Sequence, residues 1–243
     1  MLGMSTRSAV WQWQAVGKHP TAADYIQVMG GTPLTKALGE WMTKGYDQWQ
    51  AGRPGAHEPC SFRFWLRGGQ KEHLVCGVVR DSSDRIGRPF PLMLMGEGTL
   101  RGWEQRWASL PLVLEKTWAR MERLAVHGYG DLKEFGEELM QLTAPRDQDG
   151  EPAAKTPPSA TSDPVWQTCQ ADLRQSGRAT MPLHAPPGQD PSQYAANRHA
   201  GLERCCTETP RAVFMGGNPR RSCLTVILQP LTAADFVTLW SVA

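Results

Sequence analysis

Hydrophobic and polar residues alternate along several short stretches of the chain, and this period of two predicts β-strands. The first such stretch, residues 9–16, places Trp11 and Trp13 on one side and Gln12 and Gln14 on the other. We therefore expect a half-buried strand whose tryptophan side faces the core.

Further strands are predicted where alternating or continuous apolar runs are separated by turn residues. Residues 62–66 and 73–79 flank the Gly68-Gly69 turn, which is typical of a β-hairpin, and residues 92–95 follow as a third strand. Three successive strands of this kind favour an antiparallel sheet. Two closing strands are predicted at residues 211–215 and 223–228.

Apolar residues spaced three or four apart predict the helices. Thr32 is a suitable cap and Pro33 a suitable first residue for a helix that extends to Trp49. A longer pattern covers residues 100–125, where Pro111 predicts either a kink or two consecutive helices. Shorter helices are predicted at residues 131–142, with Asp131 as the cap, and at 165–175, 194–202 and 232–240.

These elements predict an α/β fold, a single domain over residues 1–243, because strands and one-sided helices must cover each other. We expect a three-layer sandwich with a central mixed, largely antiparallel sheet flanked by helices; an α+β arrangement is the alternative. Residues 144–164 contain no large apolar residue and predict a flexible insertion. Residues 176–206 predict a long loop around one short helix.

Composition and charge narrow the function classes. The 243 residues are 40% hydrophobic and 21% charged, as in soluble globular proteins. A net charge of +2 without any Lys/Arg-rich run argues against a nucleic-acid-binding protein. No apolar run is long enough to cross a bilayer, and residues 1–10 lack the apolar core of a signal peptide. We therefore expect a cytoplasmic protein that does not insert into membranes.

Six cysteines are present, but none forms a Cys-x-x-Cys motif and no paired histidines accompany them. We therefore predict no metal site, no cofactor and reduced thiols. The adjacent pair Cys205-Cys206 permits a redox-responsive module as a third-ranked hypothesis, against incidental thiols near a loop.

A charged turn precedes an apolar strand within residues 81–95. Asp84, Arg85 and Arg88 lie close together, and Gly87 permits backbone angles closed to other residues. Two interpretations are open. The charges pair with each other in a structural turn, or the arginines bind a phosphate or carboxylate, which guanidinium groups grip with two hydrogen bonds.

The same turn carries a resemblance to a known family. Residues 83–92, Ser-Asp-Arg-Ile-Gly-Arg-Pro-Phe-Pro-Leu, closely resemble the Asp-Arg-x-Gly-Arg-x-Phe-Pro-Leu signature of the TagF/ImpM family, which is associated with bacterial type VI secretion. The resemblance is specific over about the first half of the chain. In the second half the resemblance is weak, and only Pro230 and Phe236 correspond to family residues by their position.

A second signature of that family, Gly-Lys-x-Pro-x-x-Gly-Asp-Phe, resembles residues 17–25. The matching residues are Gly17, Lys18, Pro20 and Asp24. Ala23 stands in place of the family's glycine, and Tyr25 stands in place of its phenylalanine. The family also has a conspicuous tryptophan in the helix that follows, to which Trp41 corresponds.

The resemblance implies a non-catalytic regulator of type VI secretion. Such proteins act after translation and repress secretion through contact with a forkhead-associated scaffold protein. The residues carried over as partner-binding or motif-structuring are Lys18, Asp24, Trp41, Asp84, Arg85, Gly87 and Arg88.

An enzyme is the competing hypothesis, in which Asp84, Arg85 and Arg88 form a phosphate or carboxylate site. The sequence has no Gly-x-Ser-x-Gly and no Ser-x-x-Lys, and its six histidines are scattered. We therefore expect no catalytic residue.

Overall fold

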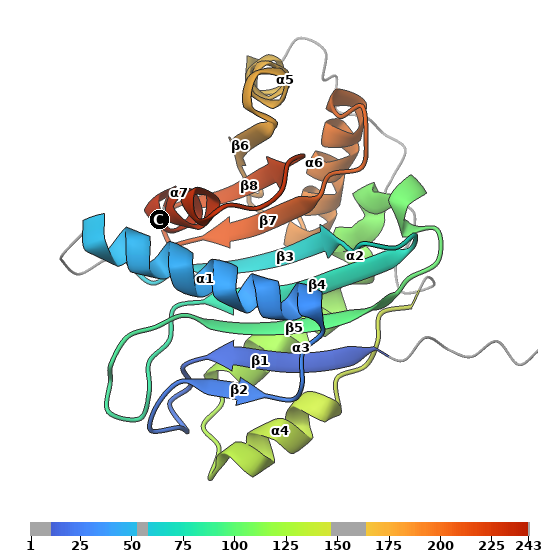
Figure 1. The fold of residues 1–243 in the computed structure, drawn as a ribbon. Helices are drawn as coiled ribbons and strands as arrows, with labels where there is room; N and C mark the ends of the chain where they lie inside the picture. The colour runs from blue at the N-terminus through green and yellow to red at the C-terminus, as the bar shows by residue number, and fades with distance from the viewer. Residues whose placement is uncertain (1–10, 53–57, 147–163, 243) are drawn as a thin grey trace, which may run out of the picture.

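A single eight-stranded sheet forms the centre of the protein (Figure 1). The computed structural model describes residues 11–52, 58–146 and 164–242. The strands lie in the order β2-β1-β5-β4-β3-β7-β8-β6, and every pairing among them is antiparallel. Their bounds are β1 Gln12–Gly17, β2 Ile26–Val28, β3 Ser61–Arg67, β4 His73–Arg80, β5 Leu92–Thr99, β6 Arg178–Pro182, β7 Ala212–Gly217 and β8 Ser222–Ile227.

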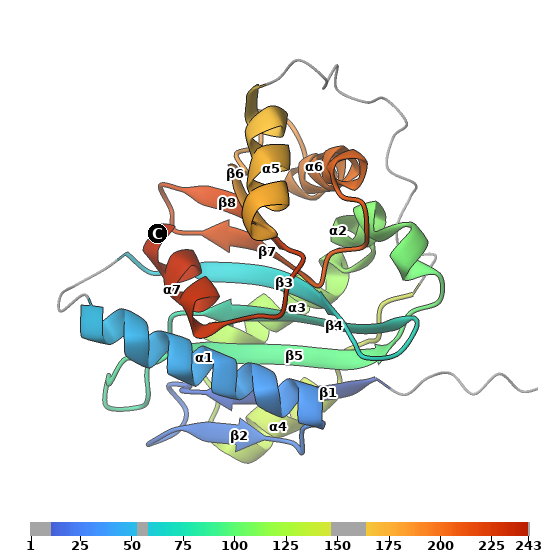
Figure 2. The same cartoon turned by 45° about the horizontal axis from the view of Figure 1, so that its top comes forward.

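Helices cover both faces of this sheet. Figure 1 shows α1 and α7 in front of the strands and α3 behind them, and Figure 2 shows α5 and α6 beside the β6–β8 end. The helices are α1 Pro33–Gly52, α2 Leu110–Val113, α3 Glu115–Val126, α4 Leu132–Met140, α5 Pro164–Ser176, α6 Pro191–Cys205 and α7 Ala233–Val242, with 3₁₀ turns at Trp103–Gln105 and Trp107–Ser109.

Two hydrophobic clusters, one on each face, hold the three layers together. On the α1/α7 face, Met42 and Trp240 pack over Phe64 and Phe214, which are cross-strand partners in β3 and β7. The opposite cluster is built from the tryptophans of the 3₁₀ turns and α3 together with Phe135 of α4. The α/β fold class, with helices on both sides of a largely antiparallel sheet, is therefore confirmed.

The predicted helix starts are also present. Thr32 Oγ1 accepts the backbone N–H of Thr35 at 3.3 Å, and Asp131 Oδ1 accepts that of Glu134 at 2.8 Å. The pattern over residues 100–125 is broken more often than the single proline suggested. Pro111 lies in the first turn of α2, and a second break at Leu114 separates α2 from α3.

Two strands were missed by the sequence pattern. Strand β2 has only three residues, too few for alternation to show, and β6 lies within residues 176–206, which we expected to be a loop around one short helix. Helix α6 is also longer than the predicted segment 194–202. Most of the insertion predicted at residues 144–164 lies outside the described residues.

The first strand is more buried than expected. Gln14, which the pattern placed opposite the core side, is only 3% exposed because α1 covers that face of β1. Among the described helices, none has the length and apolar character needed to cross a membrane.

Candidate functional site

The charged turn joins β4 to β5 and is closed by its own backbone. The N–H of Asp84 donates to the Arg88 carbonyl at 3.2 Å, and the N–H of Gly87 donates to the Asp84 carbonyl at 2.9 Å. Gly87 has a φ of +84°, a left-handed conformation that costs glycine little. A bridge between Ser83 and Pro89 brackets the turn.

The Asp84 carboxylate is the centre of this turn and is only 2% exposed. Its Oδ1 accepts the backbone N–H groups of Ile86 at 3.2 Å and Arg88 at 2.9 Å. Its Oδ2 accepts Arg88 Nε at 2.6 Å and lies 3.0 Å from Lys18 Nζ. The carboxylate therefore points inward and organises the loop.

These contacts keep Asp84 ionised. Burial alone would raise the pKa of its carboxyl, but the hydrogen bonds from the Arg88 backbone, Lys18 and the Arg88 side chain outweigh burial and hold the pKa well below its usual value. The same carboxylate raises the pKa of the Arg88 guanidinium. Two cations thus surround one buried anion.

The two family-like segments, residues 17–25 and 83–92, form one unit. The N–H of Arg85 donates to the Ala22 carbonyl at 2.7 Å, and Arg88 Nη2 donates to the Ala23 carbonyl at 2.8 Å. The absence of a side chain at Gly17 lets the two segments approach each other, because a β-carbon there would lie 2.0 Å from the Pro91 carbonyl oxygen.

Asp24 and Arg85 occupy the outer part of the unit. Asp24 lies 3.6 Å from Arg88 Nη2 and accepts the backbone N–H of Tyr25 at 2.8 Å. Within the described part of the chain, the Arg85 guanidinium has no ion-pair or hydrogen-bond partner. Beside it, Ile86 is 71% exposed. The turn therefore presents one unpaired cation next to one exposed aliphatic side chain.

Trp41 lies apart from this unit, on the α1/α7 face. Its indole Nε1 donates to the Thr232 carbonyl at 2.7 Å, and its ring centroid lies 5.5 Å from that of Phe214 and 5.3 Å from that of Phe236. These contacts fasten α1 to the start of α7. The structure therefore brings Lys18, Asp24, Asp84, Arg85, Gly87 and Arg88 together and places Trp41 elsewhere.

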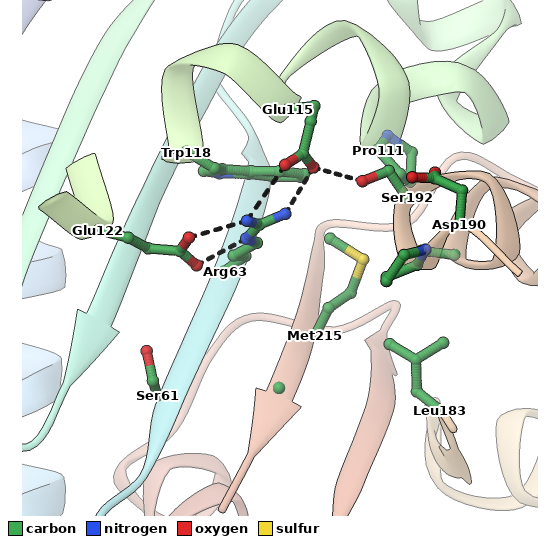
Figure 3. Close-up of a pocket in the computed structure, with 13 residues that line it drawn as sticks. Ser61, Arg63, Pro111, Glu115, Trp118, Glu122, Leu183, Asp190, Ser192 and Met215 are labelled. Atoms are coloured by element: carbon green, nitrogen blue, oxygen red, sulfur yellow. Dashed lines mark hydrogen bonds and ion pairs between the residues drawn. The ribbon is translucent and has the colours of Figure 1, made fainter. Parts of the chain in front are cut away.

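A cavity of about 430 Å³ on the other face of the sheet contains charged residues that the sequence patterns did not single out. Figure 3 shows Arg63 of β3 between Glu115 and Glu122 of α3. Arg63 donates to Glu122 at 2.7 and 2.8 Å and to Glu115 at 2.6 and 3.3 Å. Its guanidinium carbon lies 5.8 Å from the centroid of the Trp118 ring.

The Arg63 network also reaches the C-terminal part of the chain. Ser192, near the start of α6, donates to Glu115 at 2.6 Å. Burial would lower the pKa of Arg63, but the hydrogen bonds and charge of Glu122 and Glu115 outweigh burial and raise it. The guanidinium thus stays charged, and its role is to join the sheet to α3. No sequence spacing signals it, because its partners lie 52 and 59 residues away.

The cysteines offer no ionised thiol. Burial raises the pKa of Cys205, and it raises that of Cys206 to about 12. Protonated thiols are poor nucleophiles and poor metal ligands. Across the three described segments, no group of three or more His, Cys, Asp or Glu side chains is placed to hold a metal ion.

Three comparisons place the chain among known proteins. A family model described as TagF N-terminal domain, type VI secretion system-associated, matches residues 15–142, which is just over half of the 243 residues. No curated protein matches the chain. The crystal structure of PA0076 from Pseudomonas aeruginosa PAO1 is similar with a TM-score of 0.54 and 18% identity, over 94% of this chain and 93% of that one. That likeness describes the fold.

Proposed function

The chain belongs to the TagF N-terminal domain family of type VI secretion system-associated proteins, and on this premise we propose that it is a non-catalytic regulator. It represses secretion after translation by binding a forkhead-associated scaffold protein in the cytoplasm. It needs no cofactor for this, since the proposed activity is binding alone.

One observation carries the proposed contact surface: Arg85 is the cation of the turn that Asp84 leaves unpaired. Arg88 and Lys18 are held by Asp84, so they shape the loop. Arg85 and Ile86 extend from that fixed loop into solvent. An arginine beside an apolar side chain on a rigid support is typical of an interface hot spot, and its charge favours an acidic partner segment.

The same geometry supports binding over catalysis. A phosphate-handling site at this turn would need Arg85 and Arg88 to converge on a ligand, whereas the Nε of Arg88 is directed at Asp84, 2.6 Å away. Asp84 itself is a fully ionised acceptor surrounded by donors, which makes it a poor general acid or nucleophile.

The proposal is tested by deleting the gene in its own host and measuring the amount of tube protein released into the medium. A repressor predicts increased release on deletion and decreased release on overproduction. Release that stays flat in both cases would end the regulator hypothesis.

The contact surface is tested with Arg85→Ala, which removes the unpaired guanidinium and leaves the Asp84 contacts intact. We expect this variant to fold normally and to recover less of the scaffold protein in a pull-down. Arg174→Ala is the matched control, because Arg174 is an exposed arginine on α5, at the other end of the sheet. Equal recovery with both variants would move the contact surface away from the turn.

A further inference from the structure

A second cavity, of about 480 Å³, lies between α1 and the β1–β2 edge of the sheet. Its walls come from Val16 of β1, Tyr25 and Gln27 at β2, and Gly39 of α1, where the missing side chain leaves room. This cavity is on the α1/α7 face, opposite the Arg63 cavity.

Gln14 lines this cavity and has an unusual environment. The residue is 3% exposed, and within the described part of the chain neither its Oε1 nor its Nε2 has a hydrogen-bond partner. A carboxamide offers two N–H donors and one carbonyl acceptor, and buried groups of this kind are nearly always paired in folded proteins. A side chain that leaves all of them unpaired at the wall of a cavity indicates a missing partner.

The neighbouring hydroxyl groups do not supply that partner. Thr35 Oγ1 donates to the Thr32 carbonyl at 3.2 Å, and Thr43 Oγ1 donates to the Gly39 carbonyl at 3.0 Å. Both hydroxyls are therefore directed at the backbone of their own segment. Gly31 packs directly on the amide, because a β-carbon at that position would lie 2.3 Å from Gln14 Oε1.

The Gln14 amide selects a ligand group that both donates and accepts. An anion would pair only with Nε2, and a cation would pair only with Oε1. At the rim, Glu40 and Lys44 lie 3.5 Å apart and offset each other, and Lys36 adds one further cation. A second carboxamide is the side-chain group that can accept from Gln14 Nε2 and donate to Gln14 Oε1 at the same time.

We propose that this cavity binds the carboxamide of an asparagine or glutamine side chain from a partner polypeptide, with Gln14 as the recognising group. Because both amide atoms are buried in the free protein, binding requires the Gln14 side chain to rotate toward the incoming group. The polypeptide source rests on the proposed function: Tyr25 lines the cavity, and its ring centroid lies 5.5 Å from that of Phe90 in the signature segment. The cavity therefore adjoins the proposed contact surface.

The first test uses the purified protein and the probe N-acetyl-glutamine N-methylamide, followed through the side-chain amide resonance of Gln14 by NMR. We expect a saturable shift with this probe and none with N-acetyl-glutamate N-methylamide, which has a carboxylate in place of the amide. No shift with the glutamine probe, or equal shifts with both, would overturn the proposal.

The second test is Gln14→Met, which keeps the length of the side chain and removes the unpaired amide. We expect a melting temperature roughly 2 to 4 °C higher for the free protein, together with loss of the probe-induced shifts of neighbouring residues. A purely structural role for Gln14 predicts the opposite sign, so a lower melting temperature would overturn the proposal. Gln12→Met on the same strand is the control, since Gln12 is exposed and should change neither readout.

These results are separable from the secretion experiment. Probe binding is measured without any secretion component, so it stands even if gene deletion leaves secretion unchanged. Gln14→Met should also lower recovery of the scaffold protein at least twofold relative to Gln12→Met. Equal recovery, with the probe still bound by the unmodified protein, would overturn the assignment of the carboxamide to that partner.

Discussion

Trp65 Nε1 lies 3.2 Å from His199 Nε2 and joins β3, within the family-matched segment, to α6 beyond it. An indole nitrogen can only donate, so His199 Nε2 accepts. The ring proton is then on Nδ1, 2.8 Å from the Ala195 carbonyl, to which it donates. The bond from Trp65 requires a neutral imidazole, because a protonated Nε2 could not accept it. Complete burial accordingly lowers the pKa of His199 to about 4, although the bond to Ala195 opposes this shift.

This arrangement predicts a loss of stability in mild acid. The unfolded chain takes up a proton on His199 near pH 6.5, whereas the folded chain takes it up only near pH 4. The contribution is therefore complete above pH 6.5 and is lost as the pH falls toward 4. We expect the free energy of unfolding to drop by about 2 kcal/mol between pH 7 and pH 5, measured by urea titration.

His199→Gln is the control for this prediction, because glutamine does not titrate. The variant should lose less stability than the unmodified protein between the same two pH values. His19, whose pKa is also lowered mainly by burial, contributes equally to both proteins. Identical pH dependence in the two would show that His199 is not the responsible group.

The next prediction concerns the buried carboxylate of the signature turn. Asp84→Ala removes the acceptor of two backbone N–H groups and leaves Lys18 and Arg88 without their common anion. We expect the melting temperature to fall by several degrees, measured by circular dichroism at pH 7.

Asp24→Ala is the matched control, since the Asp24 side chain is 72% exposed and reaches Arg88 only at 3.6 Å. It should change the melting temperature by a degree or less, on the order expected for an exposed ion pair. Equal effects from the two substitutions would mean that the turn does not depend on Asp84.

A third prediction addresses Trp41. Trp41→Phe keeps an aromatic ring against Phe214 and Phe236 but removes the hydrogen bond to the Thr232 carbonyl. We expect a loss of about 1 to 2 kcal/mol in the free energy of unfolding, because the phenyl ring is smaller than the indole and the part-buried hydrogen bond to Thr232 is lost. Scaffold recovery should be unchanged, since Trp41 lies away from the turn. Reduced recovery with normal stability would assign Trp41 a direct role in binding.

Much of the fold could be predicted from the sequence because the core strands and helices bury continuous or periodic apolar residues. The failures have local physical reasons. Ile26–Val28 is too short to show a period, and the edge strand β6 contains Arg178, Thr180 and Pro182. Gln14 was assigned to the solvent-facing side because no pattern in the sequence reveals that α1 covers that face of β1.

The signature turn was recognised from the sequence, but which of its two arginines pairs with Asp84 and which stays unpaired was not. Arg85 and Arg88 have the same chemistry and lie three residues apart, and only the folded loop decides which of them reaches Asp84. The Arg63 network was missed for a related reason. Charged pairs between a strand and a helix have no fixed spacing, so they appear only when the packing of β3 against α3 is known.

The last prediction tests that network. Arg63→Ala leaves Glu115 and Glu122 on one helix face beside Trp118, without the guanidinium that separates and neutralises them. Removing one member of a largely buried ionic network is costly; with these side chains 26–35% exposed, we expect a loss of about 2 kcal/mol at pH 7. Adding Glu122→Gln to Arg63→Ala should recover part of the loss at pH 7, measured by urea unfolding. A deficit that Glu122→Gln does not reduce would instead assign the effect to the lost packing of the arginine side chain against Trp118.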